Sequence, residues 1–336
     1  MLLAGDIGGT KTVLALFTAA DGPHKPISEA RFNSGKYQKL AIIVEEFLSQ
    51  TGERPVIATF GVAGPVDDEI VRVTNLPWLV DAKELRRVLQ IDDVYLINDL
   101  EAIAYSIPAL DRDDLEIIKK GDRQSDGPIA VIAPGTGLGE AFLFWDGNRY
   151  RPIPSEGGHT DFAPATPLEL ELLKYLQPRL GHVSYERVCS GLGVPNIYDF
   201  IRDTKICEEP SWLRGELEVA ADPTPIIFRY AREGKAEICE ATVSLFLSIL
   251  GSEAGNLVLQ VLATGGVYLG GGIPPRIVPE LRGEPFLKAF TGKGRFTDFL
   301  MNVPVDVIMN SKAALFGAAN HGLIILSKNE SLRHET

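Results

Sequence analysis

The chain has 336 residues, of which 45% are hydrophobic and 23% charged, the composition of an ordinary globular protein of about two domains. Its formal net charge of -12 argues against a general binder of nucleic acid or of anionic membranes, because phosphate groups attract basic surfaces. Binding of one small anion in a local pocket remains compatible with this charge.

Targeting and redox signals indicate a cytoplasmic protein. The three cysteines have no CxxC spacing and fit reduced thiols better than a disulfide framework. The N-terminus reaches Asp6 too early for a signal peptide. The most apolar stretch, 241–263, contains polar residues that are costly in lipid, so we expect a buried helix packed closely through Gly251 and Gly255.

The first third of the chain alternates apolar runs with turns. Runs at 1–5 and 12–18 flank a glycine-rich turn and predict a β-hairpin. The same patterns predict strands at 27–32, 56–62 and 94–97, and helices at 40–48, 83–89 and 100–107.

The strand–turn–strand unit then recurs at 129–145, around a second glycine-rich turn. Two such turns, if they face one another, can hold one polyanion between two domains. Later patterns predict helices at 167–176, 224–232 and 236–262, strands at 267–269 and 303–309, and a last helix at 312–326 capped by Asn310 or Ser311. Strands followed by helices indicate the α/β class.

The first turn has the composition of a phosphate-binding segment. Gly8 and Gly9 let backbone N–H groups approach a phosphate, and Thr10 and Lys11 add donors. A P-loop is rejected, because a P-loop requires a helix where the strand-like run 12–18 follows. The alternative is a plain hairpin turn.

Two further glycine-rich segments are less specific when taken alone. Thr136 and Gly137 lie in a turn that a strand-like run follows, which disfavours a dinucleotide-binding fingerprint and favours a second phosphate-facing hairpin. Gly270, Gly271 and Gly272 follow a predicted strand and permit close backbone approach, although on their own they indicate only a loop.

Asp99 lies where a predicted strand passes into a helix, a common position for chemistry in α/β folds. The alternative role is that of the helix N-cap, and the two roles are compatible.

The segment 155–161 is the densest polar and flexible stretch of the chain. Glu156 and His159 suit hydrogen bonding to sugar hydroxyls, since Glu accepts and His donates or accepts. A solvated loop is the alternative. Glu186, in 185–191, is less informative and could face solvent.

Eight motifs in order carry a resemblance that spans nearly the whole chain. They are DIGGTKT (6–12), GVAGPV (61–66), TNLPW (74–78), INDLEA (97–102), APGTGLGEA (133–141), SEGGHTDFAP (155–164), YERVCSG (185–191) and LGGGIPP (269–275). Together they resemble the bacterial glucokinase family, within the hexokinase/actin-like ATPase superfamily. The cysteine-rich zinc motif of the related repressor/open-reading-frame/kinase group is missing, which indicates the non-zinc type.

The resemblance implies a two-domain actin-like ATPase (ribonuclease H-like) α/β fold with the active-site cleft between the domains. The small domain would comprise 1–109 plus about 311–330, and the large domain 110–310.

It also implies a role for each matching residue. Asp99 matches the general base, and the sugar ligands match Asn98, Glu156, His159 and Glu186. The nucleotide-binding positions are Asp6, Gly8, Gly9, Thr10, Lys11, Thr136, Gly137, Gly270, Gly271 and Gly272. Asp6 matches a carboxylate that helps to hold Mg²⁺ through water.

The function implied is that of a glycolytic glucokinase, which uses Mg–ATP to phosphorylate the 6-hydroxyl of glucose. The alternatives are a kinase of another hexose (mannose, fructose or an N-acetyl amino sugar), a non-catalytic sugar sensor, or an actin-like ATPase. The expected partners are glucose and ATP, without nucleic acid or membrane, and a homodimer is expected because two-fold dimers are the commonest oligomers.

Overall fold

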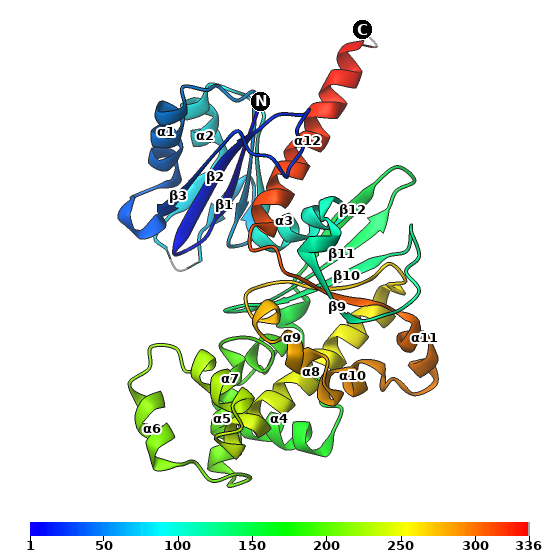
Figure 1. Cartoon of the computed structure of the whole chain (residues 1–336). Helices are drawn as coiled ribbons and strands as arrows, with labels where there is room; N and C mark the ends of the chain where they lie inside the picture. The colour runs from blue at the N-terminus through cyan, green and yellow to red at the C-terminus, as the bar shows by residue number, and fades with distance from the viewer. Residues whose placement is uncertain (75, 335–336) are drawn as a thin grey trace. The chain divides into compact units, whose positions relative to one another are not determined.

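The computed structural model describes residues 1–74 and 76–334, so Asn75 of the 74–78 motif lies outside the described residues. The chain divides into two compact units (Figure 1). Unit 1 comprises Met1–Asp114, Tyr150–Pro152 and Asn310–Thr336, and unit 2 comprises Leu115–Arg149 and Ile153–Met309.

Unit 1 contains a five-stranded sheet of order β3-β2-β1-β4-β8. Its strands are β1 (Leu2–Ile7), β2 (Lys11–Phe17), β3 (Ser28–Asn33), β4 (Ile57–Val62) and β8 (Val94–Asn98). The predicted hairpin is confirmed, since β1 and β2 are antiparallel. β1, β4 and β8 run parallel to one another, so their carboxyl ends lie at the same edge of the sheet.

Helices cover both faces of this sheet. They are α1 (Leu40–Thr51), α2 (Ala82–Leu89), α3 (Asp99–Ser106) and α12 (Ala313–His334). Leu3 and Ile7 of β1 belong to one apolar cluster, which includes α1 and α2, whereas Leu2 belongs to another, which includes α12. Successive side chains of a strand point to opposite faces, so β1 is buried on both sides and reads as a continuous apolar run.

A second, small sheet of order β5-β6-β7 also lies in unit 1. Its strands are β5 (Val66–Asp67), β6 (Ile70–Arg72) and β7 (Leu79–Asp81). Each has only two or three residues, too short for the apolar alternation that predicts a strand from sequence.

The last helix is longer than predicted. Asn310, one of the two expected capping residues, accepts a hydrogen bond from the Lys312 backbone N–H at 2.8 Å. α12 continues past the predicted end at Leu326 as far as His334, because no glycine or proline follows Leu326 to terminate it.

Unit 2 is built on a six-stranded sheet of order β12-β11-β10-β13-β14-β9. Its strands are β9 (Leu115–Lys119), β10 (Ile129–Pro134), β11 (Leu138–Trp145), β12 (Tyr150–Ser155), β13 (Gly266–Leu269) and β14 (Val305–Ile308). The second predicted hairpin is confirmed, because β10 and β11 are antiparallel around the turn 135–137. The edge strands β9 and β12 were not predicted, since charged and proline residues interrupt their apolar pattern.

The helices of unit 2 were predicted only in part. They are α4 (Pro167–Leu180), α5 (Gly193–Asp203), α6 (Ser211–Glu218), α7 (Thr224–Arg232), α8 (Glu237–Val261), α9 (Val278–Leu281), α10 (Glu284–Thr291) and α11 (Thr297–Asn302). Sequence patterns predicted α4, α7 and α8, whereas the other helices have at most eleven residues and no marked capping signal.

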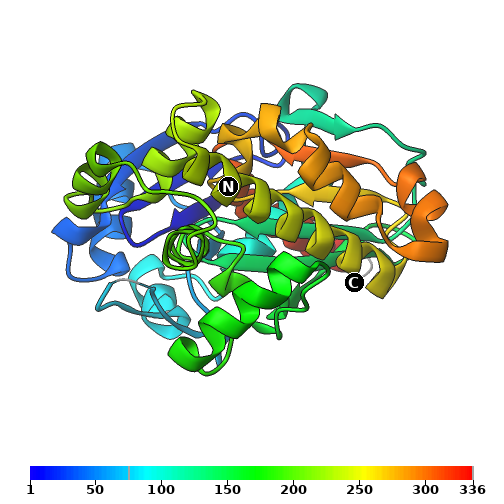
Figure 2. The same cartoon turned by 90° about the horizontal axis from the view of Figure 1, so that it is seen from below.

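The long helix α8 forms the centre of unit 2, and Figure 2 shows α10 alongside it. A Cβ atom on Gly251 would overlap the Phe286 carbonyl oxygen, and one on Gly255 would lie 2.6 Å from the Phe290 carbonyl oxygen. The predicted close packing through these glycines is therefore confirmed. By length and composition α8 is the one described helix able to cross a membrane, but it is mostly buried inside the protein.

Candidate active site

Asp99 is the first residue of α3, directly after β8, at the carboxyl edge of the parallel strands of unit 1. This is the edge at which ligands bind in open α/β sheets. Burial, helped by the neighbouring Asp6 carboxylate, raises the pKa of its carboxyl to about 6, and the backbone hydrogen bond from Leu100 opposes this rise. At neutral pH the carboxyl is therefore mostly ionised, and its pKa lies close enough to the working pH for it to accept a proton, as a general base requires.

The N-cap of α3 is Asn98 and not Asp99. Asn98 Oδ1 accepts a hydrogen bond from the Leu100 N–H at 2.8 Å, because its extended backbone turns the side chain over the first helical turn. Asp99 Oδ1 accepts from the same N–H at 2.9 Å. The N-cap reading of Asp99 is thus wrong, and its second carboxylate oxygen is available for chemistry.

The side chain of Asn98 also has a second structural partner. Its Nδ2 donates to the carbonyl oxygen of Gly64 at 2.9 Å. Gly64 has a φ of 142°, where other residues are strained, and this conformation directs the loop after β4 toward Asn98. The side chain of Asn98 also acts as a hydrogen-bond partner of the Asp99 carboxyl.

Asp6 lies on β1, one residue before its end, and its side chain is 18% exposed. Burial raises the pKa of this carboxyl, and Lys11, whose Nζ lies 3.9 Å from Asp6 Oδ2, lowers it. The edge of unit 1 therefore combines two partly buried carboxyls, Asp6 and Asp99, with one lysine. A divalent cation with oxygen ligands fits such a pair, because it offsets the repulsion between the two carboxylates.

Hydrogen bonds within unit 1 fix the position of the first glycine-rich turn. The Gly8 N–H donates to the Lys11 carbonyl at 2.9 Å, and Ser34 Oγ donates to the Gly8 carbonyl at 2.8 Å. The Ser34 N–H donates to the Thr10 carbonyl at 3.1 Å. With these carbonyl groups bonded within unit 1, the turn around Gly9 is fixed in place and the Thr10 side chain is exposed.

The second glycine-rich turn, in unit 2, lies against one of the predicted sugar ligands. The backbone N–H of Leu138 donates to Glu186 Oε2 at 3.1 Å. A Cβ on Gly137 would overlap the same oxygen, so glycine is required for this approach. Thr136 has an exposed side chain, as a phosphate ligand needs.

Glu156 precedes and His159 ends a short 3₁₀ turn, Gly157–His159, that follows β12. Both side chains are exposed, and His159 Nε2 lies 3.9 Å from Glu156 Oε2. The structure groups them in unit 2 with Glu186, whose 3₁₀ turn (Tyr185–Arg187) packs against theirs. Exposure of two adjacent hydrogen-bonding side chains suits a polar ligand.

The three glycines 270–272 follow β13 and wrap around the end of β10. The Gly270 N–H donates to the Ile132 carbonyl at 2.9 Å, and the Ile273 N–H donates to the Pro134 carbonyl at 3.1 Å. Gly271 has a φ of 77°, and a Cβ there would lie 2.6 Å from the Pro134 carbonyl oxygen. Gly272 has open space where a Cβ would stand.

That open space belongs to a cavity of about 1000 Å³ within unit 2. Gly135, Thr136 and Gly272 line it, so the second turn and the glycine segment meet at one pocket. The remaining wall was not predicted: it includes Leu192, Phe228, Arg229, Arg232, Arg276 and Ile277. The proline-rich loop 221–225, which lines the same cavity, was the available signal in the sequence.

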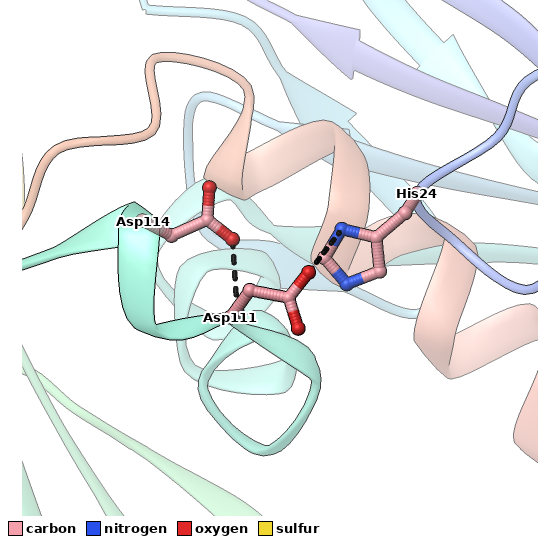
Figure 3. A group of neighbouring side chains, drawn as sticks. All are labelled: His24, Asp111 and Asp114. Carbon is pink, nitrogen blue, oxygen red and sulfur yellow. Dashed lines mark hydrogen bonds and ion pairs between the residues drawn. The ribbon is translucent and has the colours of Figure 1, made fainter.

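One group of side chains in the described residues has the spacing of a metal site. It consists of His24, Asp111 and Asp114, in unit 1 (Figure 3). His24 Nε2 lies 2.5 Å from the Ala109 carbonyl oxygen, and Asp114 accepts hydrogen bonds from the Asp111 N–H and from Asn310 Nδ2. These contacts join three chain segments, and none of the predicted site residues takes part.

The structure thus collects the predicted residues into two sets. Unit 1 holds Asp6, Gly8, Gly9, Thr10, Lys11, Asn98 and Asp99, and unit 2 holds Thr136, Gly137, Glu156, His159, Glu186, Gly270, Gly271 and Gly272. Sequence reasoning missed Glu140, a fully buried acid beneath the 157–159 turn.

Comparison with solved structures defines the class of protein. A crystal structure of a glucokinase from an Antarctic psychrotroph matches with a TM-score of 0.83 and 33% identity, over 96% of this chain and 98% of that chain. A glucokinase of the ROK family from Streptomyces griseus, in complex with glucose and AMPPNP, has a TM-score of 0.61 at 18% identity, over 96% and 98% of the two chains, which is a likeness of fold alone. The chain therefore has the two-domain actin-like fold of sugar kinases, as predicted.

Sequence relatives give the family. The family model described as Glucokinase matches residues 3–323. A glucokinase of Trichormus variabilis is 42% identical over 334 residues, covering 95% of this chain and 98% of that protein. A glucokinase of Synechocystis is 38% identical over 341 residues, with 94% and 96% coverage. The chain belongs to the glucokinase family, which confirms the resemblance identified from its motifs.

Proposed function

We propose that this protein transfers the γ-phosphoryl group of Mg–ATP to the 6-hydroxyl of glucose, giving glucose 6-phosphate and ADP. Relatives named glucokinase, up to 42% identical over nearly the whole chain, support glucose as the acceptor. The observation that carries the chemistry is Asp99, a half-buried carboxyl with a pKa of about 6 at the carboxyl edge of parallel strands.

The nucleotide would bind through the glycine-rich segments. Backbone N–H groups and the hydroxyls of Thr10 and Thr136 are suited to the phosphates, with Lys11 as the added positive charge. The cavity lined by Gly272 and Phe228 is large and apolar enough for an adenosine group. Arginines in its wall would donate hydrogen bonds to the polar atoms of that group.

The sugar would be held by Asn98, Glu156, His159 and Glu186, which supply amide, carboxylate and imidazole partners for its hydroxyls. Asp99 would accept the proton of the 6-hydroxyl as that oxygen forms its bond to the γ-phosphorus and ADP leaves. Phosphoryl transfer depends mainly on positioning and charge neutralisation. A general base typically contributes about 10²–10⁴-fold.

Mg²⁺ fits the residues present. Asp6, whose pKa is raised by burial beside a second carboxyl, is the residue that would help to hold the ion through water. When bound, the ion supplies neutralisation of the charge on the phosphates. Asp6 and Lys11 would orient the nucleotide, while Asp99 remains free to take the proton.

A cytoplasmic, glycolytic role and a homodimer complete the proposal. The three cysteines are free and buried, as expected for a reducing compartment. A mass measurement in solution tests the dimer.

The decisive experiment measures ADP release from Mg–ATP by the purified protein, with glucose and with a panel of other hexoses. Release that depends on glucose supports the proposal. Release with mannose, fructose or an N-acetyl amino sugar would retain the kinase mechanism but replace the substrate, and release without any sugar dependence would favour a sugar sensor or an ATPase.

A further inference from the structure

Glu140 is a buried acid in the sheet of unit 2. It is the third residue of β11, pairs with Ile132 of β10, and is 1% exposed. It points to the same face of the sheet as Leu138 and Phe142, both of which pack in the core beside α8. A glutamate is almost never fully buried unless it is paired.

Among the described residues, no cationic side chain is a partner of the Glu140 carboxyl. Its Oε1 is buried without a hydrogen-bond partner. The titratable groups that face this cluster are Glu253 from α8, the Tyr185 hydroxyl from the 185–187 turn and the buried Cys189 thiol. Lys293 donates to Ser252 and to Asn256, and it acts on Glu253 and not on Glu140.

The two buried acids differ in their partners. Burial raises the pKa of Glu253, whereas Asn256 Nδ2, which donates to Glu253 Oε2 at 2.8 Å, and then Tyr185 and Lys293 act to lower it. Glu140 has no such support, so burial and then the Glu253 charge raise its pKa to about 8. A carboxyl with this pKa is mostly protonated at neutral pH.

The 3₁₀ turn Gly157–His159 lies directly on Glu140. A Cβ on Gly157 would overlap Glu140 Oε2, and one on Gly158 would overlap the Leu138 carbonyl oxygen. Ser155 Oγ accepts the Gly157 N–H at 3.0 Å and closes the turn from the other side. The segment that carries Glu156 and His159 thus packs directly on the first three residues of β11.

We propose that Glu140 is a positioning residue: its buried carboxyl supports Gly157 and so holds Glu156 and His159 in place for the sugar. This inference rests on the proposed binding of sugar by that segment. Ionisation of Glu140 would leave a second negative charge facing Glu253 in an apolar core. Water must then enter, and the turn above must loosen.

The expected result is a sugar affinity that weakens at alkaline pH while the chemical step is retained. We expect the KM for glucose of the wild-type protein to rise about tenfold per pH unit above about 8, with kcat changing much less. Glu140→Gln, a neutral side chain of the same shape, should keep KM nearly constant over this range.

Glu116→Gln is the matched control, because Glu116 lies on β9 of the same sheet but is 43% exposed, and it should behave as wild type. An unchanged alkaline rise in Glu140→Gln, or a rise removed equally by Glu116→Gln, would overturn the inference.

A second measurement needs neither variant nor substrate. Amide hydrogen exchange of wild-type protein, corrected for the chemical exchange rate, should show loss of protection in 155–162 between about pH 7 and 9. Peptides from β4 in unit 1 should not change over this range. Constant protection of 155–162 would refute the role of Glu140. A loss of protection in a protein that phosphorylates no sugar would refute the proposed function and leave Glu140 as the support of the turn.

Discussion

The two glycine-rich hairpins have the same strand pairing in their sheets, but different side chains lie at the ends of their strands. β1 pairs antiparallel with β2 and parallel with β4, and β10 pairs antiparallel with β11 and parallel with β13. In unit 1 the strand ends present two carboxyls, Asp6 and Asp99. At the matching places in unit 2 the strands end in small and apolar residues beside a large cavity.

We infer from this difference a division of labour on one repeated arrangement of strands. Under the proposed function, Asp99 of unit 1 acts on the reacting proton, whereas unit 2 supplies most of the groups that bind the sugar and the adenosine. A change at Asp99 should therefore lower kcat, and changes at the binding segments of unit 2 should raise KM.

The largest effect should come from Asp99→Asn. We expect kcat to fall by about 10²–10⁴-fold, because the amide cannot accept the proton. Glucose binding, measured by calorimetry, should change little, since the size of the side chain is kept. Asp111→Asn, in an exposed residue of the same unit, is the control. Near-normal turnover in Asp99→Asn would show that Asp99 is not the base.

Gly157→Ala should be the strongest change in unit 2. Its Cβ would overlap Glu140 Oε2, so the turn must shift and the KM for glucose should rise by roughly 10- to 100-fold. Steady-state kinetics with glucose and ATP varied in turn measure the effect. Gly215→Ala on α6, where nothing lies near the new Cβ, should leave both KM values unchanged. A loss confined to kcat in Gly157→Ala would contradict the division of labour.

The pH dependence of kcat/KM tests Asp99 in the unmodified protein. Its raised pKa means that the carboxyl takes up a proton as pH falls through about 6, and only the ionised form accepts the proton of the sugar. Activity should therefore be full near pH 7 and fall about tenfold per pH unit well below 6. A profile that stays flat down to pH 4.5 would exclude a base with this pKa.

Gly272→Ala should have the smallest effect. The methyl group meets no protein atom and enters only the cavity, so stability should be unchanged. We expect the KM for ATP to rise by roughly two- to fivefold, less than about 1.4 kcal/mol of binding, with no change in the KM for glucose. If only the KM for glucose rises, adenosine does not bind in this cavity.

Local patterns predicted the elements that position these residues. Both hairpins could be predicted because apolar strands flank glycine-rich turns. A strand and not a helix follows each turn, so the P-loop at the first turn and the dinucleotide fingerprint at the second were correctly rejected. Asp99 stands out because it follows an apolar strand. The dense polar segment 155–161 singled out Glu156 and His159, whereas the proposed role of Glu186 required the family resemblance, since an exposed polar residue in a loop has no distinctive pattern.

Other features depend on contacts between distant segments, which a single sequence does not reveal. Glu140 would pass for a surface residue of a strand, and only its position beneath Gly157 and near Glu253 shows that it is buried. Asn98 was expected as a sugar ligand, and its bond to Gly64 became visible only with the loop after β4 in place. The edge strand β9 depends on pairing with β14, which lies almost 190 residues later.

The placement of α12 determines when unit 1 can form during synthesis. Leu315, Ala318 and Ala319 of α12 complete the apolar cluster that buries Leu2, and Gly322 fits against the Leu2 side chain. A nascent chain that has reached Asp114 must therefore wait for about 200 further residues, roughly 10–40 seconds of translation, before this cluster closes. The strand that carries Asp6 stays open on one face until then, and a ribosome-bound chain should become protease-resistant in unit 2 first.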